Sequence, residues 1–159
     1  MKKELKIRLF NNKDTSKVIE LISNIRINEF NLNFELAGLD LDLLVIEDYY
    51  IKSNGCFWVA ENSNNDIIGT TGIRKLTQFI STCELNRMYV DSKYRGLGLG
   101  QKLLNKAIDF ARKSGYSIML LDTYYCYDIA KKLYLKNDFQ EISRYNDNPR
   151  SQLFMKKKL

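Results

Sequence analysis

The chain has 159 residues, of which 45% are hydrophobic and 28% are charged, a balance typical of a globular protein. We expect a single domain over residues 1–159, and no apolar stretch reaches the roughly 18 residues that a membrane-spanning helix needs. The net charge of +6 comes from 25 basic and 19 acidic side chains. Residues 27–51 contain six of the acids and no lysine or arginine, so an acidic segment is set against a basic remainder.

The sequence contains no histidine, which excludes the Ser-His and Cys-His pairs of nucleophilic catalysis. A general base must then be a carboxylate, a tyrosine, the chain terminus or a water molecule. The three cysteines, Cys56, Cys83 and Cys126, are odd in number and widely spaced. We therefore expect no metal site and no disulfide framework, and a reducing cytoplasm is the simpler interpretation.

The first third of the chain carries one strand pattern followed by two helix patterns. Residues 5–10 alternate between polar and apolar side chains, as in a strand. Apolar residues recur at helical spacing over 18–30, and Asp14 or Thr15 is placed to cap that helix. The pattern over 41–49 predicts a second, shorter helix.

The middle of the chain predicts three consecutive strands. The turn-forming residues 62–66 separate the apolar runs 57–60 and 67–73, and this arrangement predicts a hairpin. Residues 82–90 then continue the series as a third strand.

The last third predicts a βαβ unit followed by closing strands. Residues 98–114 are amphipathic at helical spacing, and Gly115 is placed to end that helix. The remaining segments are shorter and predict, in order, a buried strand at 118–121, a helix at 129–137, and strands at 139–145 and 152–156. The complete order is β-α-α-β-β-β-α-β-α-β-β, an α/β (α+β) fold with a mostly antiparallel central sheet flanked by helices.

The segment Val90–Gln101 joins a strand to a helix and is rich in glycine. Glycines let the backbone approach a ligand, and the free N–H groups of the first helical turn, with the helix dipole, suit a pyrophosphate. Lys93 and Arg95 add positive charge. The alternative is a flexible loop with tight packing between helix and sheet.

The glycine spacing distinguishes between phosphate-binding loops. A dinucleotide-binding loop needs G-x-G-x-x-G, but the third glycine here, Gly100, comes one residue early. A Walker loop needs Lys and Ser or Thr after the glycine, whereas Gln101 follows Gly100. Residues 95–100 instead fit R-x-x-G-x-G, which resembles motif A of the GNAT superfamily of acetyl-CoA-dependent N-acetyltransferases.

Two further segments strengthen the resemblance, and the order of elements matches that family over essentially the whole chain. Glu84–Asp91 resembles its fourth strand, and Ala130–Phe139 resembles its motif B, A-x-x-L-Y-x-K-x-G-F. Two positions depart from the pattern. Tyr127 stands where an asparagine often contacts the pantetheine arm, and Asp138 replaces the glycine, so we expect the backbone before Phe139 to avoid positive φ.

The resemblance implies where acetyl-CoA binds. In similar proteins the fourth and fifth strands splay apart, and the pantetheine arm lies between them against the fourth strand. Carried over to this sequence, the cofactor-binding set is Met88, Tyr89, Val90, Arg95, Gly96, Leu97, Gly98, Leu99, Gly100, Gln101, Tyr127, Ala130 and Tyr134. The clustered tyrosines Tyr124, Tyr125 and Tyr127 are expected in the cleft, with packing at the sheet end as the alternative.

The resemblance also implies direct attack of an amine on the thioester. An alkylammonium has a pKa of about 10 and must lose a proton first, and the leaving thiolate gains from a proton donor. Tyr134 occupies the family's position for this acid; the alternative is a core aromatic residue. Asp122 and, ranked slightly lower, Glu84 are the candidate bases, with salt bridges at the sheet edge or a water chain as alternatives.

The acidic segment 27–51 corresponds roughly to the acceptor wall in similar proteins. A negative wall would attract a cationic acceptor, such as a polyamine or a peptide amine, unless these acids only face solvent.

A non-catalytic acyl-CoA-binding or sensing module on the same fold is the alternative function. A third interpretation, a nucleic-acid-binding protein, is disfavoured because the sequence has no defined motif in which aromatic and basic residues are interleaved. We expect no nucleic-acid or membrane partner, and the oligomeric state, including a homodimer, is left open.

Overall fold

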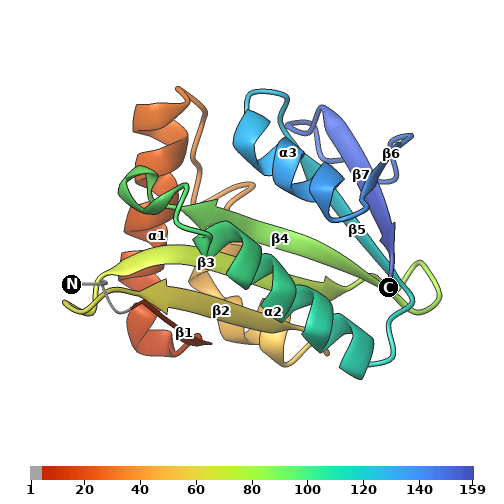
Figure 1. Ribbon diagram of the computed structural model, residues 1–159, viewed down its shortest axis with the longest axis horizontal. Helices are drawn as coiled ribbons and strands as arrows, with labels where there is room; N and C mark the ends of the chain where they lie inside the picture. Colours follow the sequence, from red (N-terminus) through yellow and green to blue (C-terminus); the bar gives the residue numbers. More distant parts are fainter. Residues whose placement is uncertain (1–4) are drawn as a thin grey trace.

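The computed structural model describes residues 5–159 and contains one seven-stranded sheet (Figure 1). The strands follow the spatial order β1-β2-β3-β4-β5-β7-β6, and every neighbouring pair is antiparallel except β4 and β5. Their bounds are β1 (Lys6–Leu9), β2 (Cys56–Glu61), β3 (Ile67–Lys75), β4 (Thr82–Val90), β5 (Ile118–Thr123), β6 (Gln140–Ile142) and β7 (Leu153–Lys158). The predicted mixed, mostly antiparallel sheet is confirmed.

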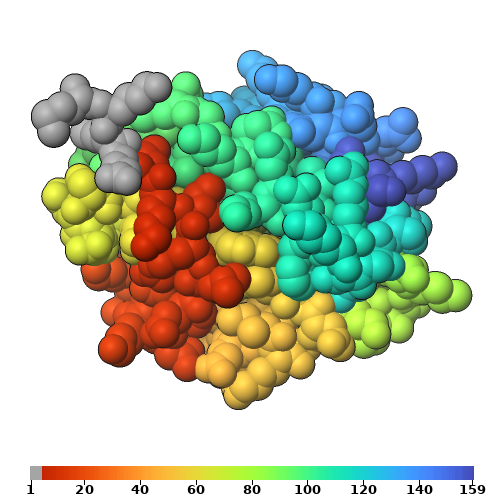
Figure 2. Space-filling model, turned by 60° about the horizontal axis from the view of Figure 1, so that its bottom comes forward, coloured from red at the N-terminus to blue at the C-terminus, as the bar shows by residue number. Residues whose placement is uncertain are grey.

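Helices cover both faces of the sheet: α1 (Thr15–Asn24), α2 (Leu99–Lys113) and α3 (Asp128–Lys136). Successive residues of β2 point to opposite faces, so Phe57 and Val59 join the core beneath α1 while Trp58 joins the core beneath α2. Figure 1 shows α2 in front of the sheet and α1 behind it. The outer surface of α2, in green and teal, lies at the centre of the face shown in Figure 2. Because both faces are covered, all six residues of β2 are buried.

The predicted helix over 41–49 is wrong. Residues Leu41–Leu44 form a short 3-10 helix and Glu47–Ile51 a single π-helical turn. The apolar residues that carried the helical spacing, Leu41, Leu44, Val45 and Tyr49, are exposed, whereas Leu43 and Tyr50 are buried in the core beneath α1. The Asp42 side chain of this segment is bound to Arg87 and to the Tyr50 hydroxyl, as described below.

Hydrogen bonds show how the start of α1 is capped. Asp14 occupies the N-cap position of α1, as predicted, but its side chain makes no cap hydrogen bond to that helix. The Asn11 side chain accepts the Lys13 N–H at 3.0 Å and caps a 3-10 turn before the helix. The Asp14 carboxylate instead accepts two hydrogen bonds from Arg8, at 2.7 and 2.9 Å.

The backbone before Phe139 does adopt positive φ, contrary to expectation. Asp138 has a φ of 66° directly after α3. Aspartate tolerates the left-handed region better than most residues, and a helix commonly ends through such a residue. The turn lets the Phe139 N–H donate to the Tyr134 carbonyl at 3.1 Å and returns the Phe139 ring to the core.

Strands β4 and β5 pair along only part of their length. They are in register at three positions, from Thr82 opposite Ile118 to Glu84 opposite Leu120. Beyond that point β4 continues to Val90 without pairing to β5, so the two strands diverge into a wedge. A bulge at Arg87, whose φ is 52°, shifts the register between β4 and β3 beside the wedge.

Candidate active site

Two cavities open in the wedge between β4 and β5. The first, here called the channel, has a volume of about 320 Å³ and runs from the glycine loop before α2 towards α3. Its walls are mainly apolar, with contributions from Phe30, Met88, Ala130 and Leu133. Of the residues expected to bind the cofactor, those that line it are Met88, Tyr89, Val90, Arg95, Gly96, Gly100, Tyr127 and Ala130.

The other residues of the glycine loop do not present side chains to the channel. Leu97 is 60% exposed, whereas Leu99 is buried in the core. The Gln101 amide is bound to Asn105 and Asn137. These positions can therefore offer a ligand only their main chain, at the helix start where N–H groups are free.

Gly98 shows that this helix start is open. It is the N-cap of α2 with a φ of 79°, and a Cβ added there would meet nothing within 4 Å. The strained conformation explains the need for glycine, and the open space leaves room for an anion.

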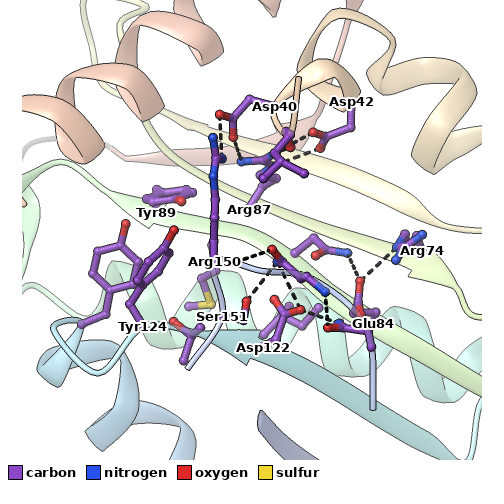
Figure 3. Close-up of a pocket in the computed structure, with 18 of the residues that line it drawn as sticks. Asp40, Asp42, Arg74, Glu84, Arg87, Tyr89, Asp122, Tyr124, Arg150 and Ser151 are labelled. Atoms are coloured by element: carbon purple, nitrogen blue, oxygen red, sulfur yellow. Dashed lines mark hydrogen bonds and ion pairs between the residues drawn. The ribbon is translucent and has the colours of Figure 1, made fainter. Parts of the chain in front are cut away.

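The second cavity, here called the polar cavity, has a volume of about 360 Å³ (Figure 3). All three catalytic candidates, Tyr134, Glu84 and Asp122, line it. Met88, Tyr89, Tyr124 and Tyr127 contribute to its wall as well, and all of these except Tyr124 also line the channel. The two cavities therefore adjoin. Tyr125 is 53% exposed and lines neither.

Tyr134 presents a protonated hydroxyl to the polar cavity. The residue is buried, and burial, with a smaller effect of Tyr89, raises the pKa of its hydroxyl. Its ring packs against Phe139 with 5.6 Å between centroids. Within residues 5–159 the hydroxyl makes no hydrogen bond, so its proton is free to be donated.

The two carboxylates occupy different environments. Glu84 is buried and accepts hydrogen bonds from Arg74 at 2.9 Å, Asn86 at 2.9 Å and Tyr145 at 2.8 Å. These three donors, one of them a cation, occupy the Glu84 carboxylate and hold it in place.

Asp122 accepts hydrogen bonds from neutral amides, those of Asn146 and Asn148. Burial raises the pKa of Asp122, and the negative charge of Glu84 adds to this effect. A carboxylate with a raised pKa and no cation bound to it is the better base of the two.

The acidic segment is neutralised by arginines from other parts of the chain, so it does not form a free negative wall. Asp40 is fully buried and accepts hydrogen bonds at 2.9 Å from both Arg87 and Arg150. Asp42 accepts from Arg87 and from the Tyr50 hydroxyl, the latter at 2.6 Å. These pairs remove the physical reason for expecting a cationic acceptor.

Another acid of the segment, Glu29, forms an ion pair with Arg95 at 2.6 Å. The Arg95 Nε also donates to the Val90 carbonyl at 2.8 Å. The segment therefore fixes the arginine of the glycine loop at the edge of the channel.

Sequence reasoning missed several polar residues of the site. Four arginines, Arg26, Arg74, Arg87 and Arg150, line the polar cavity, and they lie on four separate parts of the chain. The loop 143–152 after β6 adds further residues, although 139–145 was predicted as strand throughout. The one sequence signal was the turn-rich composition around the single proline of that loop.

The described part of the chain brings no group of three or more His, Cys, Asp or Glu side chains together in a form able to hold a metal ion. None of the helices in residues 5–159 has the length and apolar character to cross a membrane.

The sheet is opened between two parallel strands, with a glycine-rich helix start at the opening, which is the arrangement that the resemblance to the GNAT superfamily of acyltransferases implied. The chain belongs to the acetyltransferase (GNAT) family, whose model matches residues 20–139. A GNAT-family acetyltransferase from Staphylococcus aureus is 30% identical, with a TM-score of 0.92 over 98% of this chain and 99% of that one. A Salmonella typhimurium protein, whose structure is described with its cofactor acetyl-CoA, shares the fold at 22% identity and a TM-score of 0.77, over 98% and 94% of the two chains.

Curated relatives are similar over part of their length. N-acetylaspartate synthetase from Danio rerio is 34% identical over 73% of this chain and 41% of that protein. Probable N-acetyltransferase camello from Xenopus tropicalis is 38% identical over 63% of this chain and 46% of that protein. The chain thus spans less than half the length of these relatives.

The ion pairs of Asp40 predict a large effect of Asp40→Asn on stability. Burial opposes ionisation of Asp40, but the Glu35 N–H and the guanidinium groups of Arg150 and Arg87 outweigh it and lower its pKa. A lowered pKa stabilises the fold above the ordinary pKa of the group, and this stabilisation is lost as pH falls. Asp40→Asn should reduce the free energy of unfolding at neutral pH by about 3 kcal/mol or more, because two buried cations lose their shared anion.

Urea unfolding at neutral and acid pH measures this effect. The difference between the two proteins should begin to narrow below about pH 4, the ordinary pKa of aspartate, and should vanish only as pH falls through the lowered pKa of Asp40 in the folded protein. Glu35→Gln is the matched control, since Glu35 is 54% exposed and 3.6 Å from Arg150, and it should change stability by less than about 1 kcal/mol. Equal effects of the two substitutions would refute the buried cluster.

Proposed function

We propose that the protein transfers an acetyl group from acetyl-CoA to the amine of a small acceptor. The observation that carries this proposal is the junction of the two cavities at Met88, Tyr89 and Tyr127. An apolar channel beside an anion-binding helix start suits the extended CoA molecule. A polar cavity with a proton donor and a proton acceptor suits the amine. Family membership supports the same reaction class.

The channel fits acetyl-CoA in three respects. The main-chain N–H groups at the start of α2 would hold the pyrophosphate, with Gly96 and Gly98 supplying the positive φ that the loop needs. Strand β4 offers main-chain groups that β5 does not use beyond Glu84, and these would pair with the pantetheine arm. The apolar walls exclude water around the thioester.

The chemistry then requires the amine nitrogen to attack the thioester carbonyl carbon. Asp122 takes the proton that the ammonium must lose, directly or through a water molecule. The new carbon–nitrogen bond forms, the carbon–sulfur bond breaks, and Tyr134 gives its proton to the departing CoA thiolate. The second proton of the former amine then passes to the Tyr134 phenolate, which leaves a neutral amide and restores the acid. In this assignment Glu84 is a positioning residue, and its charge helps to keep the pKa of Asp122 raised.

A non-catalytic acyl-CoA-binding module is the alternative function. Such a module would need the channel, but it would not need the Tyr134 phenol or the Asp122 carboxylate, which has no ion pair, in the adjoining cavity. The presence of both groups favours catalysis. The curated relatives include N-acetylaspartate synthetases, whose name is that of an enzyme acting on a small amine. A cytoplasmic location remains a prediction from the sequence, which leaves the oligomeric state open.

Gly98→Glu tests the position of the pyrophosphate. A carboxylate at the helix start would repel the phosphates, and φ > 0 disfavours a side chain there. Acetyl-CoA should raise the Tm of the wild type and leave that of the variant unchanged. Gly115→Glu is the control, because Gly115 has a similar φ of 80° and equally open surroundings at the other end of α2. Equal shifts for wild type and Gly98→Glu would exclude this loop as the CoA site.

Tyr134→Phe tests the acid, because it keeps the ring and removes only the proton donor. We expect kcat to fall by about 100-fold, with the KM for acetyl-CoA little changed. Tyr125→Phe is the control, since Tyr125 lines neither cavity. A Tyr134→Phe enzyme with wild-type kcat would make the ring a packing residue only.

Asp122→Asn and Glu84→Gln distinguish the two candidate bases. Asp122→Asn should abolish the acid limb of the pH profile of kcat/KM. Glu84→Gln should keep that limb and move it to lower pH, because the charge of Glu84 helps to raise the pKa of Asp122. Both effects are read from initial rates of thiol release. An acid limb that persists in Asp122→Asn and vanishes in Glu84→Gln would reverse the assignment.

A further inference from the structure

Arg26 is a buried cation without a carboxylate beside it. The residue is 3% exposed and lines the polar cavity. Its Nε and Nη2 donate to the Asn33 carbonyl at 3.0 and 2.8 Å, and its Nη2 and Nη1 donate to the hydroxyls of Tyr124 and Tyr89 at 3.1 and 3.4 Å. No ion pair to Arg26 occurs within residues 5–159. A buried charge without a counter-ion is costly, so an anionic ligand would stabilise it.

The tyrosines around Arg26 do not supply that negative charge. Burial raises the pKa of Tyr127, so its phenol stays neutral, and its hydroxyl is buried without a hydrogen-bond partner. Its ring lies edge-on to those of Tyr124 and Tyr89, with centroid distances of 5.6 and 6.2 Å. The hydroxyls of Tyr124 and Tyr89 accept from Arg26, which leaves their own protons to be donated. This corner of the cavity is therefore rich in donors and contains a cation.

Arg150 supplies a second incompletely bound cation to the same cavity. Its Nη1 donates to Asp40 at 2.9 Å, but its Nη2 is buried without a hydrogen-bond partner and lies 3.6 Å from the Glu35 carboxylate. Figure 3 shows the Arg150 side chain crossing the cavity next to Tyr89. The other two arginines are bound by carboxylates, Arg87 by Asp40 and Asp42, and Arg74 by Glu84. Arg26 thus contributes a cation without a carboxylate partner, and Arg150 contributes an Nη2 donor without a hydrogen-bond partner.

We propose that the acceptor is a small amine that also carries a carboxylate, and that Arg26, with Arg150, binds that carboxylate. The proposal rests on the proposed acetyl transfer and names its substrate class, free amino acids and related amino-carboxylates. The guanidinium groups hold the anionic end, and the amine is directed to Asp122 and Tyr134 in the same cavity. A cavity of about 360 Å³ is at the small end of ligand sites, which suits such a molecule.

Matched acceptors separate the carboxylate from the amine. Initial rates of acetyl-CoA-dependent thiol release are compared for free amino acids, for the corresponding amino-acid amides, and for a diamine such as putrescine. We expect kcat/KM for the best free acid to exceed that of its amide by about 10-fold or more, which is the size of one charge-assisted hydrogen bond. Equal rates for acids and amides, or a preference for the diamine, would overturn the proposal while leaving acetyl transfer intact.

Variants assign the effect to the arginines. Arg26→Gln and Arg150→Gln should each raise the KM for the acid by about 10-fold to 100-fold, leave the KM for acetyl-CoA unchanged, and reduce the preference for acid over amide. Arg112→Gln, on the exposed side of α2, is the control and should keep the wild-type preference. A merely structural role would lower activity towards acid and amide alike. Arg26 also donates hydrogen bonds to the Asn33 carbonyl, so Arg26→Gln could disturb the fold. Circular dichroism and the Tm shift with acetyl-CoA check that this variant is folded. Arg150→Gln provides an independent test.

A binding measurement separates failure of this proposal from failure of the proposed function. The Tm of the wild type is measured in the presence of CoA with the same amino acids and amides. If the amino acids raise the Tm, the amides do not, and Arg26→Gln loses this effect, the carboxylate site is supported. If no amine is then acetylated, it is the proposed transfer reaction that fails. Equal stabilisation by acids and amides, or stabilisation unchanged in both arginine variants, would overturn the carboxylate site.

Discussion

The divergence of β4 from β5 is the constraint on which the rest of the structure depends. Two parallel strands that remained paired would bury their main-chain groups against each other. Here the pairing ends at Glu84, so β4 keeps unpaired groups up to Val90 and a wedge opens beside them. The crossover through α2 places the glycine-rich helix start at the open end of the wedge (Figure 1). Helix α3, which carries Tyr134, lies on its other side, and a channel and a polar cavity result from one interruption of the hydrogen-bond ladder.

The cluster of Asp40, Asp42, Arg87 and Arg150 fixes the outer wall of the wedge. It joins three distant parts of the chain, namely the segment before β2, the bulge in β4 and the loop after β6. Its carboxylates bind guanidinium groups of other elements, and the segment that carries them forms only short 3-10 and π-helical turns. The cluster also reverses the apparent electrostatics of the site. An acidic stretch of sequence becomes a neutral wall, and the unbalanced cation is Arg26, which lies in that otherwise acidic part of the fold.

The carboxylates of Glu84 and Asp122 acquire different roles through the groups that donate hydrogen bonds to them. Glu84 accepts hydrogen bonds from a guanidinium, an amide and a phenol, which hold its carboxylate in place. Asp122 receives amide groups from the loop after β6, and burial raises its pKa. The loop that carries Asn146, Asn148 and Arg150 therefore tunes the base and, in our proposal, helps to bind the acceptor.

The sequence by itself determined the class of fold, because the apolar runs on either side of the turn 62–66 predict paired strands and the spacing of 98–114 predicts a helix. It also indicated the family through R-x-x-G-x-G, whose first glycine, Gly98, adopts the positive φ that favours this residue. It brought Tyr134, Asp122 and Glu84 forward as candidates, but did not separate the two carboxylates, because the donors of Asp122 come from residues 24 and 26 positions later. The tertiary structure alone decided which charges are neutralised. Arg87 and Arg150 reach Asp40 across 47 and 110 residues, and pairing over such separations leaves no trace in the spacing of a single sequence.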